Sequence, residues 1–188
     1  MQLMSEILAF WRDLGPAGWY AVDAAVDKAI HDRFAQDWEA TRTGANGDWW
    51  ATSEGALAYL ILTDQFPRNM FRGDRRSFAT DGIALAAAGR AIDAGLDRQI
   101  TDAARQFFYL PLMHSEILAD QDRAVSLIAD WDGGAETLPH AEAHRDVIRQ
   151  FGRFPYRNAA LGRFTTPDEQ AFLDDGGYAA AIRARLGK

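Results

Sequence analysis

The sequence predicts an all-α protein that folds as a single domain over residues 1–188. Apolar residues recur at intervals of three and four through almost the whole chain, which is the spacing of a buried helix face. The one strand-like run, residues 58–63 (AYLILT), has no second run to pair with. With 188 residues, 48% of them hydrophobic, the chain is long enough for one well-packed core.

Two helices are predicted at the amino end. Ser5 is a candidate cap for the first helix, whose apolar positions are Ile7, Trp11 and Leu14. Asp23 is expected to open the second helix, which ends near Gly44. Its apolar positions step by four residues: Val26, Ile30, Phe34 and Trp38. Both helices should pack on a common core.

A central helix is predicted over residues 54–66 (EGALAYLILTDQF), capped by Ser53. It is apolar on almost every side, which indicates a helix that is covered all round. Pro67 should end it, because the residue before a proline is pushed out of the α region. A fourth helix then ends near Gly95, with apolar positions at Phe78, Leu85, Ile92 and Leu96.

The second half of the chain predicts further helices. A short aromatic helix over residues 101–109 is followed by a break at Pro111 and a long helix that runs to Trp131. One face of the long helix is expected to carry His114, Leu118, Gln121, Val125 and Ile128. Pro139 starts another helix, whose stripe is formed by His140, His144, Val147, Ile148 and Phe151.

The last two helices have clear start signals. Thr166-Pro167-Asp168-Glu169 combines a capping residue, a proline at the first position and an acid at the third. After Gly176-Gly177, a final helix is predicted over residues 178–187.

Composition excludes several classes of protein. The net charge of −7 argues against general nucleic-acid binding, which needs a basic face. No run of about 18 apolar residues predicts a membrane span, and the amino end has no basic leader before an apolar stretch. There is no cysteine, so disulfides and thiolate chemistry are absent. The cytoplasm is the predicted location.

One motif nearly occurs twice. The first FP motif is Phe66-Pro67-Arg68-Asn69, and the second, 88 positions later, is Phe154-Pro155-Tyr156-Arg157-Asn158. A further arginine follows each motif, Arg72 in the first case and Arg163 in the second. Segments 64–81 and 144–163 have net charges of +1 and +4, so the rest of the acidic chain sums to −12. Positive charge is therefore concentrated around the two motifs.

Two interpretations of these arginines remain open. They could fix the fold by binding helix-end carbonyls or nearby aspartates, with the asparagines shaping the turns. If the two motifs fold against each other, the arginines could instead converge on one pocket and hold a carboxylate or phosphate. The candidate ligand-binding residues are Arg68, Asn69, Arg72, Arg157, Asn158 and Arg163.

Histidines supply the candidate acid–base groups. His114 and His144 lie on apolar stretches, where a histidine is more often a core residue than a catalyst, and Glu116 lies beside the first. His140 and His144 have the spacing of two metal ligands on one helix turn, but no His-Glu-x-x-His signature is present, and no metal is predicted. The phosphate-binding and dinucleotide-binding glycine motifs are also missing, so no cofactor is predicted.

Several blocks of sequence resemble the DUF924 family of bacterial proteins of unknown function, which is placed among the tetratricopeptide-repeat-like helical proteins. The blocks are ILAFW, LTDQFPRNMFRGDRRSFATD, RQFFYLPLMHSE with LADQ after it, and HRDVIRQFGRFPYRNAALGRFTTPDEQAFL. They cover about residues 5–173. The resemblance implies stacked antiparallel helix pairs, although the usual repeat signature of about 34 residues is not traceable. It implies no activity, substrate or cofactor.

The sequence leaves three functional hypotheses. The first is a protein that binds a small anion in a pocket lined by arginine, histidine and aromatic side chains. The second is a hydrolase or lyase on an anionic substrate, with His114, Glu116 or His144 moving protons. The third is a scaffold that binds a peptide or a partner helix in a groove. The oligomeric state is left open.

Overall fold

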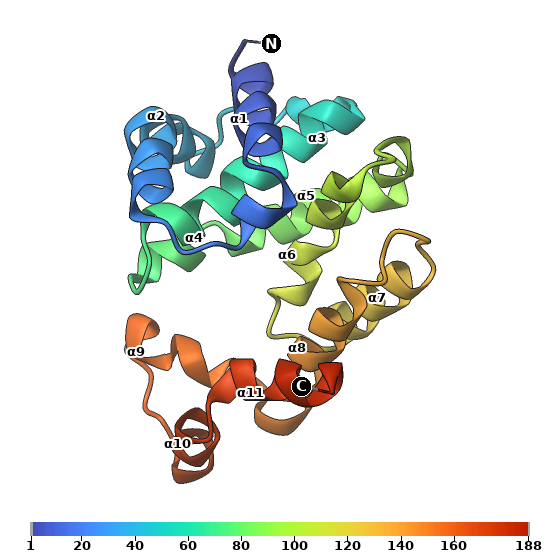
Figure 1. Cartoon of the computed structure of the whole chain (residues 1–188). Helices are drawn as coiled ribbons and strands as arrows, with labels where there is room; N and C mark the ends of the chain where they lie inside the picture. The colour runs from blue at the N-terminus through green and yellow to red at the C-terminus, as the bar shows by residue number, and fades with distance from the viewer. Residues whose placement is uncertain (1, 188) are drawn as a thin grey trace. The chain divides into compact units, whose positions relative to one another are not determined.

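The structure is a computed structural model that describes residues 2–187, and these residues form helices joined by turns, with no strand among them (Figure 1). The predicted all-α class is therefore confirmed. The chain contacts divide it into two compact units, unit 1 (Met1–Pro111) and unit 2 (Leu112–Lys188). The single domain predicted over residues 1–188 stays a prediction, and residues 1 and 188 lie outside the described part. The repeat-like stacking of helix pairs also stays a prediction.

Unit 1 contains five α-helices and several shorter helical turns. Their bounds are α1 (Gln2–Trp19), α2 (Ala24–Arg42), η1 (Trp49–Ala51), α3 (Ser53–Leu60), η2 (Ile61–Gln65), α4 (Phe66–Met70), η3 (Arg75–Phe78), α5 (Asp81–Asp93), η4 (Asp97–Gln99) and η5 (Ala103–Phe108). The short helix α6 (Leu110–Met113) runs across the boundary to unit 2.

The first two helices follow the predicted buried stripes. Ser5 lies inside α1 and is not its cap, because the helix already begins at Gln2. α1 is kinked at Gly15, whose φ of 62° falls in the left-handed region that glycine adopts without strain. Asp23 caps α2 as predicted, since its side chain accepts hydrogen bonds from the backbone of Ala25 and Val26 at 2.8 and 3.3 Å.

The central helix α3 is covered all round, as predicted. Every residue from position 55 to position 60 is buried. The cap is Thr52, one residue before the predicted Ser53, and its hydroxyl accepts from the backbone N–H of Gly55 at 3.1 Å. Just beyond, the fully buried Phe66 stacks on Phe34, with ring centroids 4.8 Å apart.

Pro67 does not end this helix, which corrects the prediction. The chain passes from α3 through the π-helical turn η2 into α4, so Pro67 lies within a helix. Because proline has no N–H, the carbonyl of Thr63 four residues earlier loses its usual donor. The buried hydroxyl of Thr80 donates to that carbonyl at 2.6 Å, and Trp38 Nε1 donates to the same hydroxyl at 3.1 Å. A tertiary contact therefore replaces the missing helical bond.

The buried face of α5 also differs from the predicted one. It is a stripe of small residues: Ala84, Ala87, Ala88 and Ala91. Leu85 and Ile92 are only partly buried, while Phe78 and Leu96 lie outside the helix. Alanine brings the backbone of α5 close to α3, with which it makes many contacts.

Unit 2 is built around the neighbouring helices α7 (Leu118–Ala129) and α8 (Leu138–Phe151). The elements that follow are η6 (Pro155–Arg157), α9 (Asn158–Leu161), α10 (Pro167–Asp174) and α11 (Gly177–Leu186). The prediction that His114 lies on the long helix is wrong, because the chain breaks between α6 and α7 and His114 lies in that break. Leu118 is exposed, while Gln121 and Ile128 of the predicted face are buried.

Two helix ends in unit 2 are determined by local sequence. α8 ends at Gly152, whose φ of 68° is left-handed, and not at Pro155 three residues later. α10 begins with a complete capping box, as predicted: Thr166 accepts from the backbone of Glu169, and Glu169 accepts from the backbone of Thr166 at 2.8 Å. Within residues 2–187, no helix has the length and the apolar character needed to cross a membrane.

Candidate functional site

The first FP motif is a network of ion pairs within unit 1. Arg68 lies 3.2 Å from the buried carboxylate of Asp64 and 3.0 Å from that of Asp81. Asp27 of α2 accepts from Asn69 at 2.8 Å and from Nε and Nη2 of the Arg72 guanidinium. Burial alone would raise the pKa of Asp27, but the bonds from Arg72 and Asn69 outweigh it and lower that pKa. These contacts fit the structural interpretation of Arg68, Asn69 and Arg72.

The second FP motif forms a comparable network within unit 2. Glu116 accepts from Arg163 at 2.7 and 3.1 Å and from the backbone N–H of Phe154 at 2.8 Å. Arg163 also donates to Asn158 Oδ1 at 3.0 Å. Burial acts to raise the pKa of Glu116, but the bonds from Arg163 and Phe154 and the charge of Arg157 together lower it. Arg163 and Asn158 therefore also have structural partners.

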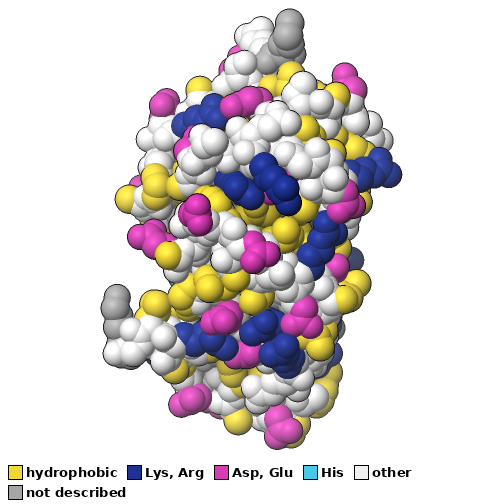
Figure 2. Space-filling model, turned by 90° about the vertical axis from the view of Figure 1, so that its right-hand side faces the viewer, with side chains coloured by type: hydrophobic (Ala, Val, Ile, Leu, Met, Phe, Trp, Pro, Cys, Tyr) yellow, Lys and Arg dark blue, Asp and Glu magenta, His cyan; other side chains and the backbone are white. Residues whose placement is uncertain are grey.

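Pairing of opposite charges is common on the surface as well. On the face drawn in Figure 2, many Lys and Arg side chains lie beside Asp or Glu side chains. In α8, for example, Arg149 bonds Asp122 of α7 at 3.0 Å. The concentration of arginine in this sequence therefore coincides with a high density of ion pairs.

Arg157 is buried against an aromatic ring. Its residue is 6% exposed, and its guanidinium carbon lies 4.5 Å from the centroid of the Phe154 ring. An arginine over an aromatic face is a cation–π contact. The charge of Arg157 acts on both Glu116 and His144, so it belongs to the same electrostatic environment as the histidines.

The histidines of unit 2 come together, an arrangement that the sequence left open for His114 and His144. The two ring centroids are 6.2 Å apart. The His144 ring also lies 4.6 Å from Tyr178 and 5.5 Å from Phe154, and His140 Nδ1 shares a hydrogen bond of 2.6 Å with the Tyr178 hydroxyl. We call the residues His114, His140, His144, Phe154 and Tyr178 the histidine cluster. It joins the end of α6 to α8, η6 and α11.

The tautomer of His144 follows from its hydrogen bond. Nδ1 lies 2.8 Å from the carbonyl oxygen of His140, and since a carbonyl can only accept, Nδ1 carries the proton. Burial, with the nearby charges of His114 and Arg157, lowers the pKa of His144 to about 3. His144 is therefore neutral near pH 7, with a lone pair on Nε2.

The position of His114 is fixed by a buried glutamine. Gln121 of α7 is fully buried, and its Nε2 donates to the carbonyls of Met113 and Ser115 at 2.6 Å each. These two residues flank His114 in the chain. Ser115 in turn donates to Asp120 at 2.6 Å. Hydrogen bonds within the segment MHSE…LADQ therefore stabilise the turn between α6 and α7.

Sequence reasoning missed two members of the cluster. Tyr178 is only the first residue of the predicted final helix, and no local signal places it against histidines 34 and 38 positions earlier. Burial raises the pKa of Tyr178, so its hydroxyl remains protonated and available as a donor. The sequence places His140 in the stripe of a helix and otherwise offers it only as a metal ligand. Among residues 2–187, no three His, Asp or Glu side chains are grouped to hold a metal ion.

The fold and this site define an all-α protein with a histidine and aromatic cluster in its carboxyl-terminal unit. Residues 7–177 match the family described as "Bacterial protein of unknown function (DUF924)", so the chain belongs to the DUF924 family. It is also similar to the solved structure of a protein of unknown function from Agrobacterium tumefaciens. The two are 43% identical with a TM-score of 0.88, and the match covers 93% of this chain and 98% of that chain. No curated protein matches the chain.

Proposed function

We propose that this protein binds a small anion, a carboxylate or a phosphate, at the histidine cluster. The observation that carries the proposal is the sign of the charge around His144. Burial is the largest cause of the lowered pKa of His144, and the positive charge of Arg157, which lies over the Phe154 ring beside His144, lowers that pKa further. A bound anion would meet a favourable potential, and Nε2 of His144 would gain a proton as a second donor.

The pKa of His144 favours ligand binding over acid–base catalysis as the function of the site. A general acid or base works best when its pKa lies near the working pH. The pKa of about 3 for His144 is well below neutrality, so this imidazole is a weak base and is not charged as an acid. Binding is therefore the better-supported function for the resting site.

An acid–base enzyme is the second candidate, favoured by one observation. The bond from His144 Nδ1 to the His140 carbonyl leaves Nε2 as the only proton acceptor of the ring, as in many catalytic histidines. An anionic substrate would raise the pKa of His144 toward the working range. The chemistry would then be hydrolysis or elimination on an anionic molecule in the cytoplasm, with His114 or Glu116 as the partner group.

The test is a histidine titration followed by NMR, with inorganic phosphate or succinate as the probe and chloride at equal ionic strength as the reference. We expect either probe to raise the pKa of His144 and to raise the melting temperature. A matched pair of variants, Arg157→Gln in unit 2 and Arg68→Gln in unit 1, separates the sites. Only Arg157→Gln should weaken the response. Equal responses to probe and chloride in the wild-type protein would overturn the proposal.

A further inference from the structure

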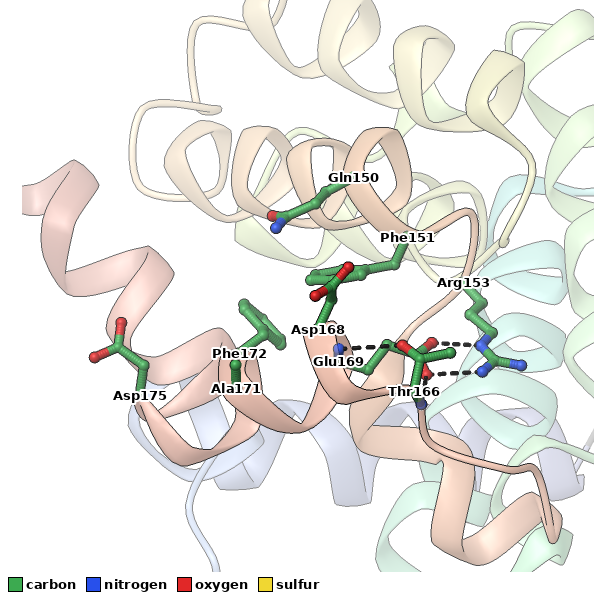
Figure 3. A pocket seen from close by; sticks show the side chains of 9 residues that line it. All are labelled: Gln150, Phe151, Arg153, Thr166, Asp168, Glu169, Ala171, Phe172 and Asp175. Carbon is green, nitrogen blue, oxygen red and sulfur yellow. Dashed lines mark hydrogen bonds and ion pairs between the residues drawn. The ribbon is translucent and has the colours of Figure 1, made fainter.

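A groove beside α10 is separate in its lining from the histidine cluster. It has a volume of about 890 Å³ and lies between the end of α8 and α10, both within unit 2 (Figure 3). Its lining residues are Gln150, Phe151, Arg153, Thr166, Asp168, Glu169, Ala171, Phe172 and Asp175. This size is ordinary for a small-molecule site.

The floor of the groove is aromatic. The rings of Phe151 from α8 and Phe172 from α10 lie 5.1 Å apart at an angle of 52°. Both pack on the buried residues Val147, Ile148 and Phe154, so the floor is supported by the core of unit 2. It can cover the apolar part of a ligand without rearranging.

α10 and its C-terminal cap carry an acid at each end of this floor. Asp168, Ala171 and Phe172 lie in α10 at positions i, i+3 and i+4, which share one helix face, and Asp175, at i+7, is the capping residue after the helix. Figure 3 shows Phe172 between the two aspartates along α10. Seven residues span about 10 Å along a helix axis, so the backbone positions of the two aspartates are about that far apart.

The other charges of the groove neutralise each other. Arg153 donates to the Glu169 carboxylate at 2.5 and 2.7 Å and to the Phe164 carbonyl at 2.7 Å. The bonds from Arg153 and from the backbone of Thr166 lower the pKa of Glu169 to about 2, so this pair stays charged and mutually paired. Among the described residues, neither Asp168 nor Asp175 has an ion pair. The free charge of the groove is therefore that of two carboxylates.

We propose that this groove binds a linear organic dication, an alkyl chain with an ammonium group at each end. The chain lies on the rings of Phe151 and Phe172, and the two ammonium groups meet Asp168 and Asp175. Aromatic faces next to carboxylates favour organic cations, since the rings add cation–π attraction to the ion pairs. This inference does not depend on the anion site proposed above.

The geometry also excludes the simpler occupants. A metal ion binds its oxygen ligands at about 2 to 2.6 Å, and among residues 2–187 no three His, Asp or Glu side chains are grouped to hold one. An anion is repelled by both aspartates. A monoamine reaches one carboxylate and leaves the other unpaired, so the dication gains the second ion pair.

The probe is octamethylenediamine, titrated by calorimetry and by NMR, and octylamine and ethylenediamine are the comparison ligands. We expect the long diamine to bind about tenfold more tightly than either, a difference of about 1.4 kcal/mol. NMR shifts of the wild-type protein should be confined to Gln150, Phe151, Phe172 and their neighbours. Equal affinities for octamethylenediamine and octylamine, shifts elsewhere, or no binding at millimolar diamine would overturn the proposal.

Variants supply the second arm of the test. Asp168→Asn and Asp175→Asn should each reduce the affinity for the diamine to that for octylamine. Asp174→Asn is the matched control, because Asp174 is outside the groove and accepts from Gln170 at 2.7 Å. It should bind the diamine as the wild type does. If Asp174→Asn weakens binding as much as the other two, the assignment of the carboxylates is wrong.

Discussion

The two FP motifs share their residues but not their backbone. Phe66 has helical angles (φ −56°, ψ −40°) and lies between η2 and α4. Phe154 is extended (φ −91°, ψ 106°) and follows a helix that has already ended at Gly152. The proline of the first motif, Pro67, therefore lies inside a helix, while the proline of the second motif, Pro155, begins a 3-10 turn.

In each motif, a side chain from elsewhere in its unit satisfies the backbone. The Thr80 hydroxyl donates to the Thr63 carbonyl in unit 1, and Glu116 accepts from the Phe154 N–H in unit 2. Both motifs also gather carboxylates around their arginines. The difference lies in the surroundings, because the second motif has the histidine cluster beside it. The comparison shows that both FP motifs stabilise the fold of their own unit through hydrogen bonds and ion pairs. A further role in ligand binding depends on the residues around the motif.

The largest expected effect comes from removing the motif phenylalanines. Phe66 and Phe154 are both fully buried, so Phe66→Ala and Phe154→Ala should each lower the free energy of unfolding by about 3–5 kcal/mol. Only Phe154→Ala should also change the NMR titration of His144, because the two rings are in contact. Urea denaturation measures the first effect. A change of the His144 titration in Phe66→Ala would contradict the separation of the two motifs.

A smaller difference in the free energy of unfolding is expected between variants of Glu116 and Asp27, the carboxylates that bind the motif residues. Glu116→Gln leaves the partly buried Arg163 without its counterion and weakens the acceptor for the Phe154 N–H, so we expect a loss of about 2–3 kcal/mol. Asp27→Asn removes a pair with Arg72, which is 40% exposed, and should cost about 1 kcal/mol. Both are measured by chemical denaturation. Equal losses in the free energy of unfolding would show that the two carboxylates contribute equally to the stability of their motifs.

The pH dependence of stability should distinguish the second motif. The pKa of His144 is 6.5 in a model peptide and about 3 in the folded protein, so the unfolded chain binds an extra proton between these values. Stability is then lost as the pH falls below about 6.5, with a slope of at most about 1.4 kcal/mol per pH unit. His144→Gln should flatten the slope between pH 7 and 5. His31→Gln, at an exposed position in α2, is the matched histidine substitution for comparison.

The smallest effect is expected at Arg72. Its pair with Asp27 is partly exposed, so Arg72→Gln should lower the free energy of unfolding by about 0.5 kcal/mol at low salt. Added salt should reduce the difference from the wild type, because exposed charges are screened. Thermal melts at low and high salt measure it. A large loss that persists at high salt would assign Arg72 a deeper structural role than its exposure indicates.

Much of the fold was predictable because its signals are local. The caps at Asp23 and Thr166 involve bonds between residues two or three positions apart, and the buried residues Ile30, Phe34 and Trp38 of α2 follow the predicted helical spacing. In α8, only Val147 and Ile148 of the predicted stripe are buried. The predicted caps at Ser5 and Ser53 were wrong, since a capping residue type is common and its neighbours offer equivalent starts. For the site, the sequence supplied His114 and His144 as candidates but not their contact, and Tyr178 had no signal.

By itself, the sequence determined the helical class, most helix positions and the family, because these depend on spacing and on local hydrogen bonds. Only the tertiary structure decided how each FP motif folds and which partners its arginines take. Where the chain continues through Pro67, the Thr80 hydroxyl donates to the Thr63 carbonyl, and where Phe154 is extended, its N–H donates to Glu116. A backbone group that loses its local partner must find one elsewhere in the fold, and sequence spacing does not reveal which residue supplies it.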